Sequence, residues 1–139
     1  MRKNLKLWHP ELSNISDLAV IGDDCTIHSN VWIGDGVFIG NHVKIQAFAF
    51  IPNGIKIENN VFIGPGVVFC NDKNPPSGSV SWDEVVVKNG AVIGANATIL
   101  PGVTIGRNTV IGAGSVVTHS IPSGETWAGN PAKKLKTKI

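Results

Sequence analysis

Apolar residues recur at every sixth position along most of this chain. The series begins at Ile15, breaks between Phe69 and Val87, and runs through Ile15, Ile21, Ile27, Ile33, Ile39, Ile45, Ile51, Ile57, Ile63, Phe69, Val87, Ile93, Ile99, Ile105, Ile111 and Val117. The residue four places after each of these is usually small or β-branched, as at Ala19, Cys25, Val31, Val43, Ala49, Val61, Ala91, Ala97 and Val103. Two of every six side chains are therefore expected to point inward.

This period fits neither an amphipathic helix nor a simple alternating strand, and Gly, Asn and Asp lie between the apolar positions. It predicts an all-β solenoid of short strands, in which three hexads close one triangular coil and stacked coils pair at about 4.8 Å. The spacing from Phe69 to Val87 is 18 residues. Because this is the length of one coil, we expect a loop at about 70–86 that leaves and rejoins the solenoid in register.

Residues 1–139 are expected to form a single domain. Residues 1–14, with Trp8, Pro10 and Leu12, would cap the first coil, and the coils would occupy residues 15–122. A basic tail would follow over residues 123–139, with lysines at Lys133, Lys134, Lys136 and Lys138. These lysines fit either a solubilising end or a phosphate contact.

Composition narrows the class of protein. The formal net charge of +2 is too balanced to indicate nucleic-acid binding, and the 16% of charged residues is below the roughly 25% usual for soluble domains. Low surface charge favours self-association. No apolar run is long enough for a signal peptide or a membrane span, so we expect a cytoplasmic protein. Cys25 takes an inward slot and Cys70 begins the loop, and no disulfide is expected between them.

Several segments carry a resemblance to a known family. They are Val43–Gln46, Ile57–Pro65, Phe69–Pro75 with its Asn-Asp-Lys loop entrance, Gly90–Gly102 and Ala128–Lys133. The chain resembles the hexapeptide-repeat acyltransferases over roughly residues 15–134, and its loop entrance resembles the N-acetyltransferases of nucleotide-linked amino sugars, most closely the 3-amino branch. The resemblance implies a left-handed parallel β-helix, a homotrimer, and acetyl-CoA bound in the groove between adjacent helices.

The same resemblance implies site residues. Acetyl-CoA would lie along the small residues Gly94, Ala95, Gly112 and Ala113, and its phosphates would meet the closing segment with Asn130, Lys133 and Lys134. Tight corner geometry explains the small residues equally well. Gln46 matches a family position near the nucleotide sugar. Lys73, Trp82 and His28 are further candidates for contacting that sugar, and a plain surface histidine is the alternative for His28. Trp82 fits an anchor for the loop as well as a cover for a ligand.

The loop entrance bears on the chemistry. Related O-acetyltransferases use a histidine there, whereas this chain has Asn71 and Asp72. An amine acceptor needs no strong base, since it is partly neutral near pH 7 and the departing thiolate, with a pKa of about 8.5, can take up the proton. We expect Asn71 to hold the amine or the developing oxyanion and Asp72 to orient the amine. Turn formation is the alternative explanation for both residues.

The function expected from sequence is transfer of acetyl from acetyl-CoA to the amino group of a dTDP- or UDP-linked amino-deoxy sugar, in particular a 3-amino sugar destined for a surface glycan. Two alternatives stay open: O-acetylation of a sugar hydroxyl with His28 or a substrate-assisted base, and a non-catalytic β-solenoid scaffold. A zinc site needs three ligands, and His28 and His42 are the only histidines in the central coils. No metal is expected.

Overall fold

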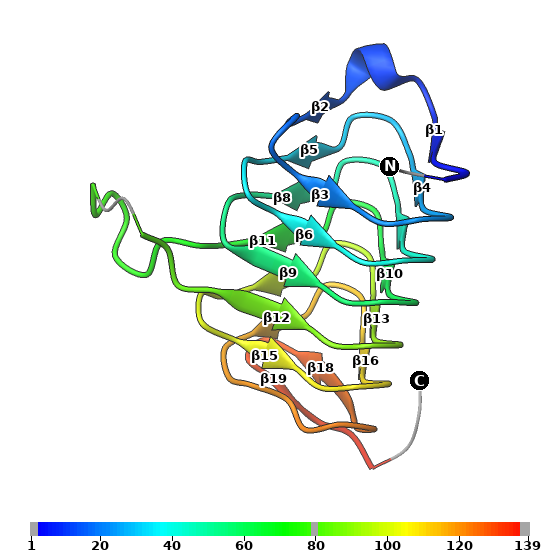
Figure 1. Ribbon diagram of the computed structural model, residues 1–139. Helices are drawn as coiled ribbons and strands as arrows, with labels where there is room; N and C mark the ends of the chain where they lie inside the picture. Colours follow the sequence, from blue (N-terminus) through cyan, green and yellow to red (C-terminus); the bar gives the residue numbers. More distant parts are fainter. Residues whose placement is uncertain (1–2, 79–80, 137–139) are drawn as a thin grey trace.

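The computed structural model describes residues 3–78 and 81–136, which form a left-handed parallel β-helix with three flat sides (Figure 1). Sheet A contains β1 (Lys6–Leu7), β4 (Thr26–Ile27), β7 (Lys44–Ile45), β10 (Phe62–Ile63), β13 (Val92–Ile93), β16 (Val110–Ile111), β18 (Thr126–Gly129) and β19 (Ala132–Lys134). Sheet B contains β2 (Asn14–Ile15), β5 (Trp32–Ile33), β8 (Phe50–Ile51), β11 (Val68–Phe69), β14 (Thr98–Ile99) and β17 (Val116–Val117). Sheet C contains β3 (Val20–Ile21), β6 (Phe38–Ile39), β9 (Ile55–Ile57), β12 (Val85–Val87) and β15 (Thr104–Ile105).

The hexad repeat produces this architecture directly. From β1 to β17 consecutive strands lie on successive sheets, and each strand pairs in parallel with the strand one coil away, as Ile27 does with Ile45 and Ile33 with Ile51. Apart from Ile15, which is half-buried, the two inward positions of each hexad are buried, and most of these side chains are no more than 1% exposed. The predicted fold class and the predicted inward positions are confirmed.

The loop is a smaller departure from the repeat than its 18-residue spacing suggests. Across it Ile63 pairs with Ile93 and Phe69 with Ile99, 30 residues apart, whereas regular neighbouring coils pair residues 18 apart, as Ile27 and Ile45 do. The insertion is therefore 12 residues long and lies at one corner, between β11 and β12. The loop leaves and rejoins the solenoid in register, as predicted, and it ends at Glu84 because β12 begins at Val85.

Both ends of the solenoid extend beyond the expected limits. Strand β1 pairs with β4, so the first coil begins at Lys6, and the 3-10 helix η1 (Pro10–Leu12) interrupts that coil. At the other end β18 pairs with β16, and β19 then returns antiparallel to β18. The capping and tail segments thus contribute strands to sheet A. In the part of the chain that the structure describes, no helix has the length and apolarity needed to cross a membrane.

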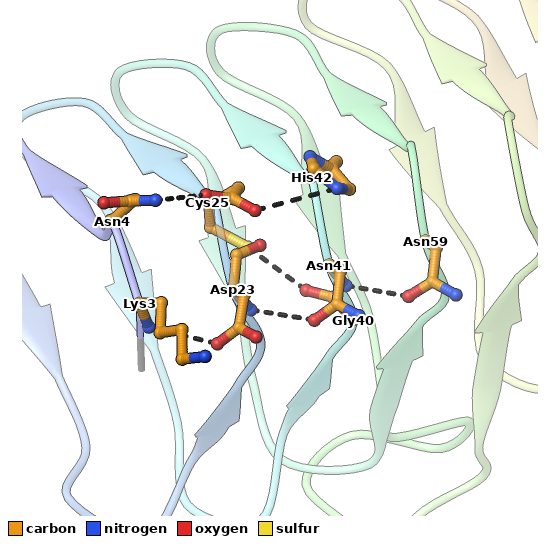
Figure 2. A network of polar contacts seen from close by, with 9 residues as sticks. Lys3, Asn4, Asp23, Cys25, Gly40, Asn41, His42 and Asn59 are labelled. Carbon is orange, nitrogen blue, oxygen red and sulfur yellow. Dashed lines mark hydrogen bonds and ion pairs between the residues drawn. The ribbon is translucent and has the colours of Figure 1, made fainter. Parts of the chain in front are cut away.

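The corner between sheets C and A carries a ladder of side-chain to backbone hydrogen bonds (Figure 2). The Asn41 side chain accepts from the backbone N–H of Asp23 at 2.8 Å, and the Asn59 side chain accepts from that of Asn41 at 2.7 Å. Asn89 continues the ladder to Asn59 at 2.9 Å, and Asp23 ends it by accepting from Lys3 at 3.0 Å. These bonds satisfy corner N–H groups that the short strands leave unpaired.

Asn59→Ala is expected to destabilise the fold by about 1–2 kcal/mol, because it leaves the Asn41 N–H without its acceptor. Chemical denaturation, followed by circular dichroism, measures this change. Asn59→Asp is the matched control, since a carboxylate fills the same role at Asp23. Equal loss in both variants would show that the ladder acceptor does not account for the effect.

Candidate functional site

A groove of about 470 Å³ runs along one edge of sheet B, at its corner with sheet C and beside the inserted loop. Its aromatic lining is Trp32, Phe50 and Trp82. Its polar lining is Asn14, Ser16, Asp35, Asn53 and Asn71. An open groove with aromatic walls and a few polar groups is the usual form of a small-molecule site.

The aromatic wall comes from outward positions of the repeat. Trp32 on β5 and Phe50 on β8 are neighbours in the parallel ladder, and their rings stack with centroids 5.3 Å apart and an interplanar angle of 28°. They remain 40% and 39% exposed. Neither residue was predicted from the sequence, because only the inward positions follow the repeat. The signal in the sequence that could have located this wall is the presence of large aromatic residues at outward positions of the repeat.

Asn71 and Trp82 fix the loop end of the groove. The Asn71 side-chain amide donates to the backbone carbonyl of Asn53 at 2.7 Å. Trp82 packs over Gly54, where an added Cβ would lie 3.1 Å from the Trp82 Cβ. Gly54 has φ of +95°, so this corner favours glycine for its backbone as well. Trp82 therefore anchors the loop and also lines the groove.

Asp72 organises the loop turn. Its carboxylate accepts from the backbone N–H of Ser77 at 2.9 Å and from that of Asn74 at 3.3 Å. The Ser77 backbone N–H, with smaller help from the Ser77 side chain and Asn74, lowers the pKa of Asp72 below its ordinary value. Asp72 is not among the residues that line the groove, and Lys73 beside it is exposed. These contacts match the turn alternative for Asp72.

Most of the other predicted residues lie at the opposite edge of sheet B, at its corner with sheet A. His28, Gln46, Gly94 and Gly112 each directly follow a strand of sheet A. Ala95 and Ala113 come next on the same corner. The His28 ring stacks on Trp8 with centroids 6.0 Å apart. Across sheet B, a path of about six residues at 3.3 Å each separates these residues from Asn71, which amounts to roughly 20 Å.

Close stacking of the coils, the corner-geometry alternative, accounts for glycine at Gly94. A Cβ at Gly94 would lie 2.7 Å from the backbone nitrogen of Ala113 and 2.8 Å from the carbonyl oxygen of Ile111. Gly64 has the same relation to Ala95 in the preceding coil. Gly94 is therefore required by the stacking of coils. Gly112 is buried, whereas Ala113 is exposed.

The closing segment is partly engaged within the chain. Lys134 Nζ lies 3.3 Å from Glu125 Oε2, and Trp127 Nε1–H donates to the same carboxylate at 2.9 Å. The Trp127 bond, followed by Lys134, lowers the pKa of Glu125. Asn130 and Lys133 are exposed, and the Asn130–Pro131 peptide bond is cis. Lys138 lies outside the described residues.

The histidines do not converge. His42 lies at the corner of sheets C and A, where its Nε2 is 3.7 Å from Asp24 Oδ2 (Figure 2). His28 lies at the corner of sheets A and B. Among residues 3–78 and 81–136, no three or more His, Cys, Asp or Glu side chains come together as metal ligands would.

Comparison with known proteins places the repeat in a family. A family model described as bacterial transferase hexapeptide (six repeats) matches residues 36–71 and 84–119, more than half of the chain. The chain belongs to the bacterial hexapeptide-repeat transferases. A second family model, the hexapeptide repeat of succinyl-transferase, matches residues 19–51 of this hexapeptide-repeat protein. No curated protein matches the chain.

Many solved structures are similar to this hexapeptide-repeat protein, and two of them carry the comparison. One is GDP-perosamine N-acetyltransferase from Caulobacter crescentus, solved as a histidine-to-alanine mutant in complex with CoA and GDP-perosamine. It is 26% identical to this chain, with a TM-score of 0.82, and the match covers 96% of this chain and 58% of that one. The other is the acetyltransferase domain of PglB from Neisseria gonorrhoeae in complex with acetyl coenzyme A. It is 25% identical to this chain, with a TM-score of 0.82, and the match covers 94% of this chain and 57% of that one. The present chain thus spans less than two thirds of either relative.

The fold is shared more widely. AntD, an N-acyltransferase from Bacillus cereus solved as a mutant in complex with dTDP and coenzyme A, has a TM-score of 0.80 and 22% identity over 99% of this chain and 83% of that one. At this identity the likeness concerns the fold alone. AntD accordingly supports the β-helix assignment.

Proposed function

We propose that this chain transfers an acetyl group from acetyl-CoA to the amino group of a nucleotide-linked amino sugar. The observation that carries the proposal is its structural likeness to the perosamine N-acetyltransferase bound to CoA and GDP-perosamine. The groove supports it, since an aromatic wall with neutral amides and one carboxylate suits a sugar ring. The finer assignment to a 3-amino sugar on dTDP or UDP rests on the Asn-Asp-Lys loop entrance.

The groove favours an amine over a hydroxyl as the nucleophile. The described residues that line it include no histidine to deprotonate a hydroxyl. His28, the base of the O-acetylation alternative, is stacked on Trp8 at the other edge of sheet B. A neutral amine attacks the thioester carbonyl directly. The C–N bond forms, the C–S bond breaks, and the proton released from nitrogen ends on the thiolate of CoA.

Asn71 is the residue we assign to the reacting amine. One N–H of its amide is held by the Asn53 carbonyl at 2.7 Å, which fixes the orientation of the group. The second N–H and the amide oxygen are then available to the substrate. A fixed amide of this kind can orient the amine lone pair or donate to the developing oxyanion.

A covalent route through Cys70 is disfavoured. Cys70 begins the loop and is half-buried, and burial raises the pKa of its thiol. The thiolate is the nucleophilic form of cysteine, so a raised pKa lowers its availability near pH 7. Direct transfer to the amine fits these facts without an acyl-enzyme.

The proposed assembly is a homotrimer. The residues assigned to acetyl-CoA and those of the acceptor groove lie at opposite edges of sheet B, so neighbouring protomers must bring a donor edge to an acceptor edge. Phe48, at the donor edge, supports an interface there. It has φ of +67°, as Asn30 and Asn96 do at the same corner of other coils, and its bulky side chain is 65% exposed.

The test is thiol release from acetyl-CoA with a panel of dTDP-, UDP- and GDP-linked sugars that carry 3-amino, 4-amino or only hydroxyl groups. We expect turnover with amino sugars only, fastest with a 3-amino member. Asn71→Ala is expected to lower kcat by about 100-fold. Asp72→Ala is expected to have a smaller effect, exerted through the loop.

Three results would count against the proposal. Reaction of hydroxyl sugars alone, giving an alkali-labile ester, would establish O-acetylation. No thiol release with any sugar of the panel, together with no CoA binding by calorimetry, would favour a scaffold. Full activity of Asn71→Ala would remove that residue from the site.

A further inference from the structure

The groove beside the loop contains a single charged side chain among the described residues that line it, and that side chain is Asp35. Asp35 lies at the sheet B to sheet C corner that follows β5. The Ser16 hydroxyl donates to the Asp35 carboxylate, and the same hydroxyl accepts from the Leu18 backbone N–H at 3.0 Å. Asp35 is thereby held at the groove rather than free to turn away.

The charge of the groove excludes one part of a nucleotide sugar. A diphosphate carries about two negative charges, and it would face Asp35 without any lysine or arginine among the lining residues. Since this chain offers no cation among the described lining residues to balance it, we place the diphosphate outside the groove. A cationic or neutral ring is the part that fits within it.

The aromatic wall lies beside this carboxylate. The Trp32 ring extends over the corner that follows β5, since an added Cβ at Gly34 would lie 2.9 Å from Trp32 Cζ3. Asp35 is the next residue, so the indole and the carboxylate border the same corner. An aromatic face attracts a cation as well as the apolar face of a ring, and a carboxylate forms its strong hydrogen bonds with charged donors.

The geometry points to a subsite for the amino-bearing ring of the acceptor, in which Trp32 supports the sugar ring and Asp35 binds its amino group as the ammonium. This inference rests on the proposed function and adds to it a specificity-determining residue. Asp72, bonded to the loop backbone, does not take this role. The bound ammonium loses one proton to water at the open groove before the free amine attacks, so Asp35 positions the acceptor and needs no role as a base.

Binding without acetyl-CoA tests the subsite. Calorimetry on the full chain would compare dTDP-3-amino-3,6-dideoxyglucose, dTDP-glucose and dTDP. We expect the amino sugar to bind ten- to a hundred-fold more tightly than dTDP-glucose, the range of a charge-assisted hydrogen bond. Asp35→Asn should abolish that preference and leave dTDP binding unchanged. In turnover the loss should fall on the KM of the amino sugar, with kcat within about three-fold.

Two further variants sharpen the result. Asp24→Asn is the matched control, a corner carboxylate on a different edge that bonds Asn4 and His42, and it should keep the preference. Trp32→Leu should weaken both sugars equally. Acetyl-CoA binding and the thermal midpoint verify that each variant is folded. If Asp35→Asn does not fold, Ser16→Ala releases the carboxylate and should reduce the preference instead.

The outcomes separate this inference from the proposed function. A preference that persists in Asp35→Asn overturns the subsite even if acetyl transfer is observed. Equal binding of amino and hydroxyl sugars by the parent protein, or no binding of either, also overturns it. An Asp35-dependent preference without any thiol release would support the subsite and contradict the proposed transfer.

Discussion

Removal of residues 72–83, combined with Glu84→Gly, is expected to leave a folded β-helix that has lost acetyl transfer by at least about 1,000-fold. The deletion joins Asn71 through a single glycine to Val85 and restores a six-residue step between Phe69 and Val87. The junction then matches the preceding coil, Ile51-Pro52-Asn53-Gly54-Ile55-Lys56-Ile57, whose glycine has φ of +95°. Activity is lost because Trp82 and the backbone hydrogen bond from the Asp83 N–H to the Asn71 carbonyl are gone, and one misplaced oxyanion donor alone costs about 100- to 1,000-fold.

Circular dichroism, the thermal midpoint and thiol release measure this outcome, and calorimetry with CoA provides the key control. CoA binding should persist, because the donor edge at the corner of sheets A and B is unchanged. Glu84→Gly alone should remain active. A deletion variant that cannot fold would show that the loop belongs to the framework, and one that still transfers acetyl would place the chemistry elsewhere.

The fold was predictable because each hexad repeats the same physical requirement. Two inward side chains and one corner recur throughout, so a local pattern such as Ile27-Ile33-Ile39 determines the global stack. The length of the inserted loop was not predictable, since the 18-residue spacing from Phe69 to Val87 fits two cases. The loop could replace a whole coil, or it could add 12 residues at one corner. The strand pairings of Ile63 with Ile93 and of Phe69 with Ile99 distinguish the two cases.

The candidate site was only partly predictable. Asn71 and Trp82 were found because the loop breaks the repeat, and both line the groove. Trp32, Phe50 and Asp35 were missed, since they belong to coils that precede the loop along the chain and reach it only through stacking. Outward positions tolerate many side chains, so sequence alone does not show which of them gather at one edge.

Gly94→Ala is expected to destabilise the fold by about 3 kcal/mol and to lower Tm by roughly 10 °C. Its Cβ would press on backbone atoms of Ile111 and Ala113, and these cannot rotate away. Relief would require the coils to separate, which strains the hydrogen bond from Gly94 N to Ile111 O at 2.8 Å. Differential scanning calorimetry measures the effect.

Ala113→Val, on the same corner as Gly94→Ala, is the matched variant that tests coenzyme binding instead of stability. Ala113 is exposed, and Pro65 occupies the equivalent position nearer the N-terminus, so the backbone there accepts a larger residue. We expect an unchanged Tm and a roughly ten-fold higher KM for acetyl-CoA, because the added methyl groups narrow the donor edge. The opposite pattern, a stable Gly94→Ala with weakened acetyl-CoA binding, would mean that Gly94 serves the coenzyme and not the coil stack. The two substitutions together therefore separate the residues that build the corner from those that bind along it.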